Sequence, residues 1–130
     1  MKYNDLTRRY FESAAGAGVL AAPGALRGAA GSRAQGTWVQ FDVLVDTNSR
    51  NGAIQAVRFL AFACPHVIAV SAWVAEQAVG HAARAELPDG VQSLRERFGV
   101  PVEKLGRLLI VEDAWIAAVA GFLQCSGREP

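Results

Sequence analysis

Cysteine, net charge and long apolar runs are all scarce in this sequence, and each scarcity argues against a class of protein. Its 130 residues hold only two cysteines, Cys64 and Cys125, too few for a small secreted scaffold built on disulfides. The 13 Lys and Arg residues face 12 Asp and Glu residues, so the net charge of +1 gives no sign of nucleic-acid binding. The candidate apolar run from Ala61 is interrupted by His66 and then by Glu76, and no run of about 18 apolar residues remains to cross a membrane.

The apolar content is nevertheless high enough for a folded core. Hydrophobic residues make up 52% of the chain and charged residues 19%, which favours a folded protein over a disordered one. The length predicts a single domain over residues 1–130. Basic residues precede an alanine-rich stretch at the N-terminus, as in a secretory signal, but Asp5 and Glu12 intervene and the stretch is built mainly from small residues. We therefore predict a cytoplasmic protein.

The N-terminal third predicts a helix followed by a loosely structured segment. Apolar residues near helical spacing, with Asn4 or Asp5 available as a cap, predict a short helix within residues 1–13. Residues 14–36 are rich in glycine and alanine, a composition that predicts a flexible approach with one short edge strand around residues 25–30.

A β-hairpin is the clearest local pattern. Apolar and polar residues alternate over residues 38–46, with Val39 and Phe41 on one face and Gln40 and Asp42 on the other. Turn-forming residues over 48–52 then lead into a second strand over residues 54–62.

Helical patterns fill the second half of the chain. We expect a long helix from Pro65 to about residue 85, a short one over residues 91–98 and a last one from about residue 103 to 123. Residues 125–130 form a polar tail. Strands first and helices later predict an α+β fold: a small antiparallel sheet of about three strands with helices packed on one face.

Several local motifs occur in an order that is familiar. They are Tyr3, the segment Gly31–Thr37, Phe62-Ala63-Cys64, Pro101–Lys104 and Glu112-Asp113-Ala114. In order and spacing these motifs resemble the NifU N-terminal or IscU-type family of iron–sulfur cluster assembly scaffolds, over almost the whole chain. The resemblance implies the α+β fold and a role as a scaffold that is not an enzyme.

The resemblance also locates a cluster site. In the family, three cysteines and an aspartate hold iron or a [2Fe–2S] cluster, because thiolates are soft ligands that suit iron. Carried over by position, the first cysteine falls on Gln35, the aspartate on Thr37 and the third cysteine on Arg107, while the second is retained as Cys64. An amide and a hydroxyl are poor iron ligands, and a guanidinium repels a metal ion. The resemblance therefore implies a degenerate site with weakened or lost cluster binding, and Cys64 as the one metal ligand kept.

Cys64 itself has two interpretations. At the predicted start of a helix it is a candidate reactive thiolate, favoured by the helix N-terminus and by Arg107 if the family geometry holds. It is equally a candidate for a small, half-buried apolar residue. His66 and His81 do not have the spacing of a helical metal pair, and we expect each to be solvated or satisfied in the core.

The family also implies protein partners. They are a cysteine desulfurase and a specialised Hsp70 chaperone, to which the family presents a segment containing a proline and a lysine. Here that segment contains Pro101 and Lys104, with Glu103 altering its centre. Two alternatives to the scaffold role stay open: a metal-free interaction or regulatory module on the same fold, and a sulfur or thiol carrier that uses Cys64.

Hydrogen exchange tests the predicted distribution of order. We expect backbone amides within residues 14–36 to exchange faster than those of the hairpin over residues 38–62, because the first segment has few large apolar side chains. Slower exchange across residues 14–36 than across the hairpin would contradict the prediction.

Overall fold

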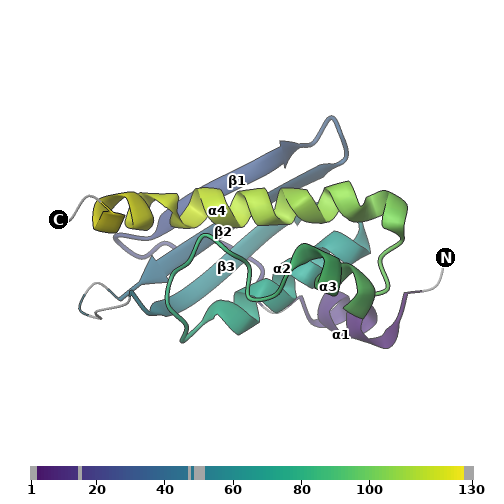
Figure 1. Ribbon diagram of the computed structural model, residues 1–130, viewed down its shortest axis with the longest axis horizontal. Helices are drawn as coiled ribbons and strands as arrows, with labels where there is room; N and C mark the ends of the chain where they lie inside the picture. Colours follow the sequence, from purple (N-terminus) through teal and green to yellow (C-terminus); the bar gives the residue numbers. More distant parts are fainter. Residues whose placement is uncertain (1–2, 15, 47, 49–51, 128–130) are drawn as a thin grey trace.

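The fold is a three-stranded antiparallel sheet in the order β1-β2-β3, with helices against one face (Figure 1). The computed structural model describes residues 3–14, 16–46, 48 and 52–127, the last four by their backbone only. The elements are α1 (Asp5–Ser13), β1 (Leu26–Ser32), β2 (Thr37–Val45), β3 (Ile54–Phe62), α2 (Pro65–Ala78), α3 (Val91–Arg97), the short 3-10 helix η1 (Val102–Lys104) and α4 (Leu105–Gly127). Helix α4 packs on β1 and β2, α2 packs on β3, and α1 packs on α2. The predicted α+β class is confirmed.

The alternation along β2 determines which face of the sheet is buried. Val39, Phe41 and Val43 are fully buried between the sheet and the helices. In the antiparallel register Trp38 pairs with Phe62 and Phe41 with Phe59, so the hairpin forms as predicted. Most of the turn predicted over residues 48–52 lies outside the described residues.

A glycine on β1 allows α4 to lie directly on the sheet. A Cβ atom at Gly28 would come within 2.1 Å of the backbone nitrogen of Ala118, so any side chain there would push the helix away. On the next strand Phe41 meets Trp115 of α4 edge to face, with ring centroids 5.5 Å apart. The small residue and the aromatic pair together bring β1, β2 and α4 into one core.

The segment before β1 has more structure than its composition predicts. Residues 16–25, here called the strap, run beside β3: the Gly18 N–H donates to the Phe59 carbonyl at 2.8 Å, and the Phe59 N–H donates to the Gly16 carbonyl at 2.9 Å. The edge strand expected around residues 25–30 extends over Leu26–Ser32 and pairs along its length with β2. The prediction of fast amide exchange for residues 14–36 therefore does not extend to the amides paired in β1 or to the Gly18 amide.

Helix α2 ends earlier than its sequence predicts. It was expected to reach about residue 85 but stops at Ala78, after which Val79 is extended and Gly80 has a φ of +90°. The Gly80 N–H donates to the Ile54 carbonyl at 2.8 Å, and the Ile54 N–H donates to the His81 carbonyl at 2.9 Å. The chain leaves the helix because these hydrogen bonds join it to the start of β3, and glycine tolerates the left-handed turn.

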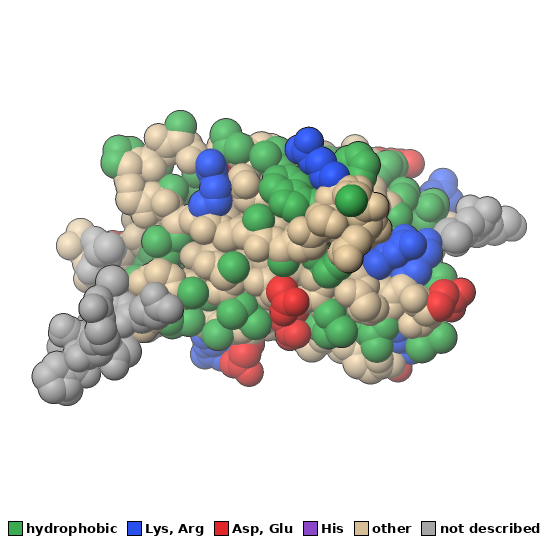
Figure 2. All heavy atoms as spheres, turned by 90° about the horizontal axis from the view of Figure 1, so that it is seen from above, with side chains coloured by type: hydrophobic (Ala, Val, Ile, Leu, Met, Phe, Trp, Pro, Cys, Tyr) green, Lys and Arg blue, Asp and Glu red, His purple; other side chains and the backbone are tan. Residues whose placement is uncertain are grey.

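Helix α4 is longer than predicted. It continues to Gly127, so the first residues of the predicted polar tail are helical, and residues 128–130 lie outside the described part. No helix in the described part of the chain is both long and apolar enough to cross a bilayer. On the face shown in Figure 2, Lys and Arg side chains are scattered among hydrophobic and uncharged ones and form no continuous basic surface.

Asp42 links the strap to the sheet. It lies on the side of β2 opposite Val39, as predicted, yet it is buried because other groups surround its carboxylate. The Arg27 guanidinium donates to both carboxylate oxygens, at 2.8 and 2.9 Å, and the Leu20 N–H donates at 2.9 Å. The hydrogen bonds from Arg27 lower the pKa of Asp42, burial acts in the opposite direction, and the Leu20 N–H lowers the pKa further.

Replacing this carboxylate should destabilise the protein in a way that depends on pH. We expect Asp42→Asn to lower the free energy of unfolding at neutral pH by about 1–3 kcal/mol, because hydrogen bonds to a charged group are lost. The folded-state pKa of Asp42 lies below its unfolded value, so the stabilisation is complete above that unfolded value, about 3.9, and is lost as the pH falls through the folded-state pKa. Urea unfolding across this pH range measures both effects. Asp113→Asn, at an exposed carboxylate, is the matched control, and equal losses in the two variants would contradict the assignment.

Candidate functional site

Three segments meet at the end of the molecule that lies nearest the N-terminus in Figure 1: the turn between β1 and β2, the junction of β3 and α2, and the start of α4. Trp38 at the start of β2 pairs with Phe62 at the end of β3. A Cβ atom at Gly31 would lie 3.0 Å from Cγ2 of Ile110 on α4, so this end of β1 touches the helix. The four positions carried over from the family belong to these segments.

Cys64 lies at the junction where β3 ends and α2 begins. It is the N-cap of α2 with an extended backbone, and Pro65 follows as the first helical residue because its fixed φ suits that position. The thiol is half-buried and not in a disulfide. The backbone N–H groups of His66 and Val67 face the sulfur without completing a capping hydrogen bond of normal geometry.

The surroundings of Cys64 favour its thiolate. Burial raises the pKa of the thiol, but the Val67 N–H and hydrogen bonding from the Arg107 guanidinium lower it. The charge of Lys104 and the His66 N–H lower it further, and the net result is a pKa below the usual cysteine value. The positive end of a helix and two nearby cations therefore stabilise a negative sulfur here.

Arg107 is the position to which the resemblance assigns the family's third cysteine. It is the third residue of α4 and is exposed. Two carboxylates, Glu112 and Asp113, lie a turn or two further along the same helix. Among the ion pairs of the described residues, neither is joined to Arg107. The guanidinium instead contributes hydrogen bonding to the Cys64 thiol, which lowers the pKa of that thiol.

Gln35 and Thr37 occupy different environments. Gln35 is exposed in the turn between β1 and β2, where its backbone N–H donates to Ser32 Oγ at 3.2 Å. Thr37 is the first residue of β2 and is 3% exposed. By the alternation of the strand it lies on the same face as Val39, toward the helices. Among the described residues neither side chain forms a hydrogen bond with Cys64, whereas Arg107 acts directly on the thiol.

His66 corrects an expectation made from the sequence. The ring was expected to be solvated or satisfied by hydrogen bonds, but it is 1% exposed and neither nitrogen has a partner among the described residues. The Tyr3 ring packs against it edge to face, with centroids 4.7 Å apart. Burial lowers the pKa of His66, and the charges of Lys104 and Arg107 lower it further, so the ring is neutral at pH 7. In the sequence, the one signal that His66 belongs to this site was its closeness to Cys64.

The remaining candidates are dispersed. Pro101 and Lys104 are half-buried just before α4, and Lys104 is close enough to influence Cys64 electrostatically. His81 is exposed beyond the end of α2. Cys125 lies in the last turns of α4, of which only the backbone is described.

The residues at this end do not fit a metal cluster. No group of three or more His, Cys, Asp or Glu side chains in the described part of the chain could hold a metal ion. A [2Fe–2S] cluster needs four protein ligands, and here one thiol faces a guanidinium and an ammonium. The negative charge of a Cys64 thiolate is offset here by Arg107 and Lys104.

Comparison with known proteins assigns the chain to a family. The family model described as NifU-like N terminal domain matches residues 2–128, and the chain belongs to this family. The resemblance inferred from the motifs is confirmed. A search of curated proteins found no match.

Solved structures share the fold. A protein from Fervidobacterium islandicum AW-1, described as an iron-sulfur cluster assembly scaffold for the SUF system, is 16% identical, with a TM-score of 0.66 over 90% of this chain and 96% of that one. The N-terminal part of a nitrogen-fixing NifU-like protein from Brucella abortus is 19% identical, with a TM-score of 0.51 over 92% of this chain and 78% of that one. At these identities the likeness establishes the fold alone.

The reactivity of Cys64 tests the electrostatics of the site. In a Cys125→Ser background we expect alkylation of Cys64 to have its midpoint below about pH 8.5, and Arg107→Ala to raise that midpoint by about one pH unit. The removal of a cation leaves the thiolate less stabilised, which is why the midpoint rises. The measurement is the rate of iodoacetamide labelling against pH.

Arg58→Ala, which removes an exposed cation on β3, is the matched control and should leave the midpoint unchanged. A midpoint at or above that of a free cysteine, unmoved by Arg107→Ala, would remove the argument for a reactive thiolate.

Proposed function

We propose that this protein serves iron–sulfur cluster assembly as a scaffold-type protein that does not itself hold a stable cluster. It acts without catalytic turnover and keeps the partner contacts of the scaffold fold. Family membership supports the class of role. One observation supports the rest: hydrogen bonding from the Arg107 guanidinium lowers the pKa of the Cys64 thiol, and the resemblance assigns the family's third thiolate to position 107.

The charge of this arrangement opposes iron. Iron and sulfide are the cargo of a scaffold, and cationic iron is held by thiolates that offset its charge. At Cys64 the thiolate is instead stabilised by Arg107 and Lys104. Binding iron would require moving at least one of these cations away. The amide of Gln35 and the hydroxyl of Thr37 are poor iron ligands and would add little binding energy.

The proposed partners are those of the assembly machinery, a cysteine desulfurase and a chaperone. Pro101 and Lys104, the counterparts of the family's chaperone segment, lie directly before α4 at the same end as Cys64. The proposal assumes the cytoplasm, where reducing conditions keep a thiol such as Cys64 free.

The lowered pKa of Cys64 favours a second candidate, a sulfur carrier. The Cys64 thiolate would attack the outer sulfur of a persulfide on a cysteine desulfurase. The sulfur–sulfur bond of the donor breaks, the donor cysteine leaves as a thiolate, and Cys64 becomes the persulfide. A metal-free interaction module is what remains if neither cluster nor persulfide forms.

Reconstitution with iron and sulfide tests the proposal. We expect the wild-type protein to give little visible absorption and well under one iron per chain, because a single thiolate cannot satisfy two irons. The triple variant Gln35→Cys, Thr37→Asp, Arg107→Cys should recover part of the absorption. Its control, Gln35→Ser, Thr37→Asn, Arg107→Ser, removes the same cation without adding thiolates.

Near-stoichiometric iron and sulfide in freshly purified wild-type protein would contradict the degenerate site. Mass spectrometry after incubation with a cysteine desulfurase and cysteine separates the remaining candidates. Gain of one sulfur atom that is lost in Cys64→Ser supports the carrier, and no gain supports the interaction module.

A further inference from the structure

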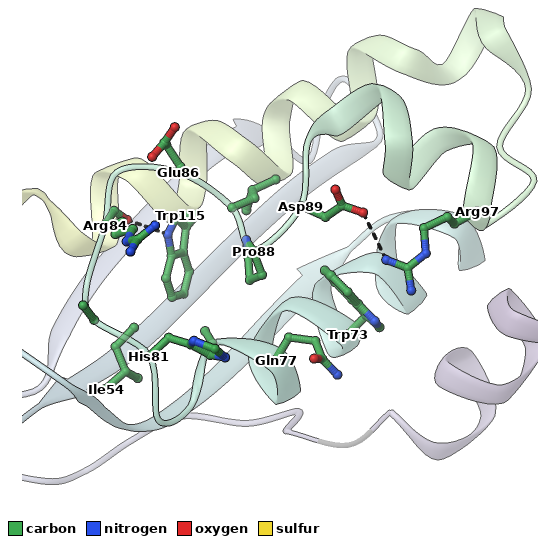
Figure 3. Close-up of a pocket in the computed structure, with 13 residues that line it drawn as sticks. Ile54, Trp73, Gln77, His81, Arg84, Glu86, Pro88, Asp89, Arg97 and Trp115 are labelled. Atoms are coloured by element: carbon green, nitrogen blue, oxygen red, sulfur yellow. Dashed lines mark hydrogen bonds and ion pairs between the residues drawn. The ribbon is translucent and has the colours of Figure 1, made fainter.

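A second cavity lies away from Cys64, between α2, α3 and the segment of residues 79–90 (Figure 3). Its volume of about 460 Å³ is in the range of small-molecule sites. In Figure 3, Trp115 and Trp73 stand at its two ends, Pro88 lies on one side, and His81 and Gln77 lie on the opposite side. Its lining is mixed, with apolar rings facing a few polar groups.

The walls of this cavity are fixed in the free protein. The Ala83 N–H donates to the Gly52 carbonyl at 2.9 Å, which ties the segment 79–90 to the hairpin. The Trp115 indole N–H donates to the Arg84 carbonyl at 2.9 Å, so the ring is held and its polar atom is satisfied. When a ligand binds to a preformed site, the entropic cost of ordering the protein is small.

The far end of the segment is anchored as well. Asp89 accepts hydrogen bonds from the Gly90 N–H at 2.8 Å and from the Ser93 hydroxyl at 2.8 Å, both at the start of α3. It also pairs with Arg97 at 3.0 Å, and the Arg97 guanidinium lies over the Trp73 ring at 4.9 Å from its centre. The positive charge of Arg97 is therefore already compensated.

Two further charged side chains line the cavity, Arg84 and Glu86. Arg84 is exposed, and its guanidinium has no hydrogen bond or ion pair among the described residues. In Figure 3 the carboxylate of Glu86 is directed away from Trp115 and Pro88, and it forms no ion pair with Arg84 among the described residues. A bound molecule would meet apolar rings inside and a cation at the edge.

We infer that this cavity binds a small planar aromatic anion, with its rings between Pro88 and His81 and its negative group at Arg84. The indole and proline surfaces suit a flat ring system. The guanidinium suits a carboxylate, sulfonate or phosphate. The site is separate from Cys64, so it stands whether or not the proposed function is correct.

Two naphthalene probes that differ in charge test the inference. Anilinonaphthalene sulfonate has the rings and a negative group, and N-phenyl-1-naphthylamine has the same rings without it. We expect saturable binding of the sulfonate with one site per chain, and Arg84→Gln should weaken it about threefold to tenfold while leaving the neutral probe unchanged. Arg33→Gln, which removes the cation over Trp38 at the other end of the molecule, is the matched control.

The location is tested in the unmodified protein. In an NMR titration the indole N–H signals of Trp115 and Trp73 should move with the sulfonate probe, and that of Trp38 should not.

A variant that fills the cavity tests the location a second time. Ala82→Phe, which places a ring at the cavity lining, should abolish binding of both probes, with circular dichroism confirming that the variant is folded.

Equal affinities of wild type and Arg84→Gln for the sulfonate would overturn the assignment of the anion to Arg84. Movement of the Trp38 signal alone would overturn the site.

Discussion

The close approach of α4 to the sheet is the constraint on which the rest of the structure depends. The helix can lie on β1 because Gly28 has no side chain, and it is held on β2 by the packing of Trp115 against Phe41. The same helix supplies Arg107 to the thiol at one end of the molecule and Trp115 to the cavity further along. A displacement of α4 would therefore alter both sites together.

At Cys64, the position that the resemblance assigns to a cluster ligand, the positive charge comes from protein side chains. In a scaffold of this family the thiolates surround a metal. Here Arg107 and Lys104 come from the protein itself and are always present. These cations lower the pKa of the Cys64 thiol and so favour its thiolate form in the absence of iron. The buried His66 ring beside it is neutral and adds no charge.

The sequence was sufficient for the elements whose burial follows a local period. The alternation of Val39, Phe41 and Val43 located β2, because a one-residue shift would expose all three. The end of α2 could not be predicted, since it depends on hydrogen bonds that join Gly80 and His81 to Ile54, far away in the chain. The cavity was missed for the same reason, because its wall begins where the helix was expected to continue.

The sequence predicted which residues belong to the candidate site better than it predicted their arrangement in space. The strand-to-helix change placed Cys64 at a helix start from local residues alone. The proximity of Arg107 to Cys64 came from the family resemblance, because no local pattern joins α4 to α2. The burial of His66 depends on Tyr3, from the other end of the chain, and only the folded structure brings the two rings together.

The length of α4 also determines what oxidation can do to this protein. Cys125 follows Arg107 by 18 residues on one continuous helix, so about 27 Å of helix separates them at a rise of about 1.5 Å per residue. A disulfide needs Cα atoms within about 7 Å, and Arg107 is the residue that meets Cys64. The chain therefore has no internal partner for Cys64, and any disulfide it forms must join it to another molecule.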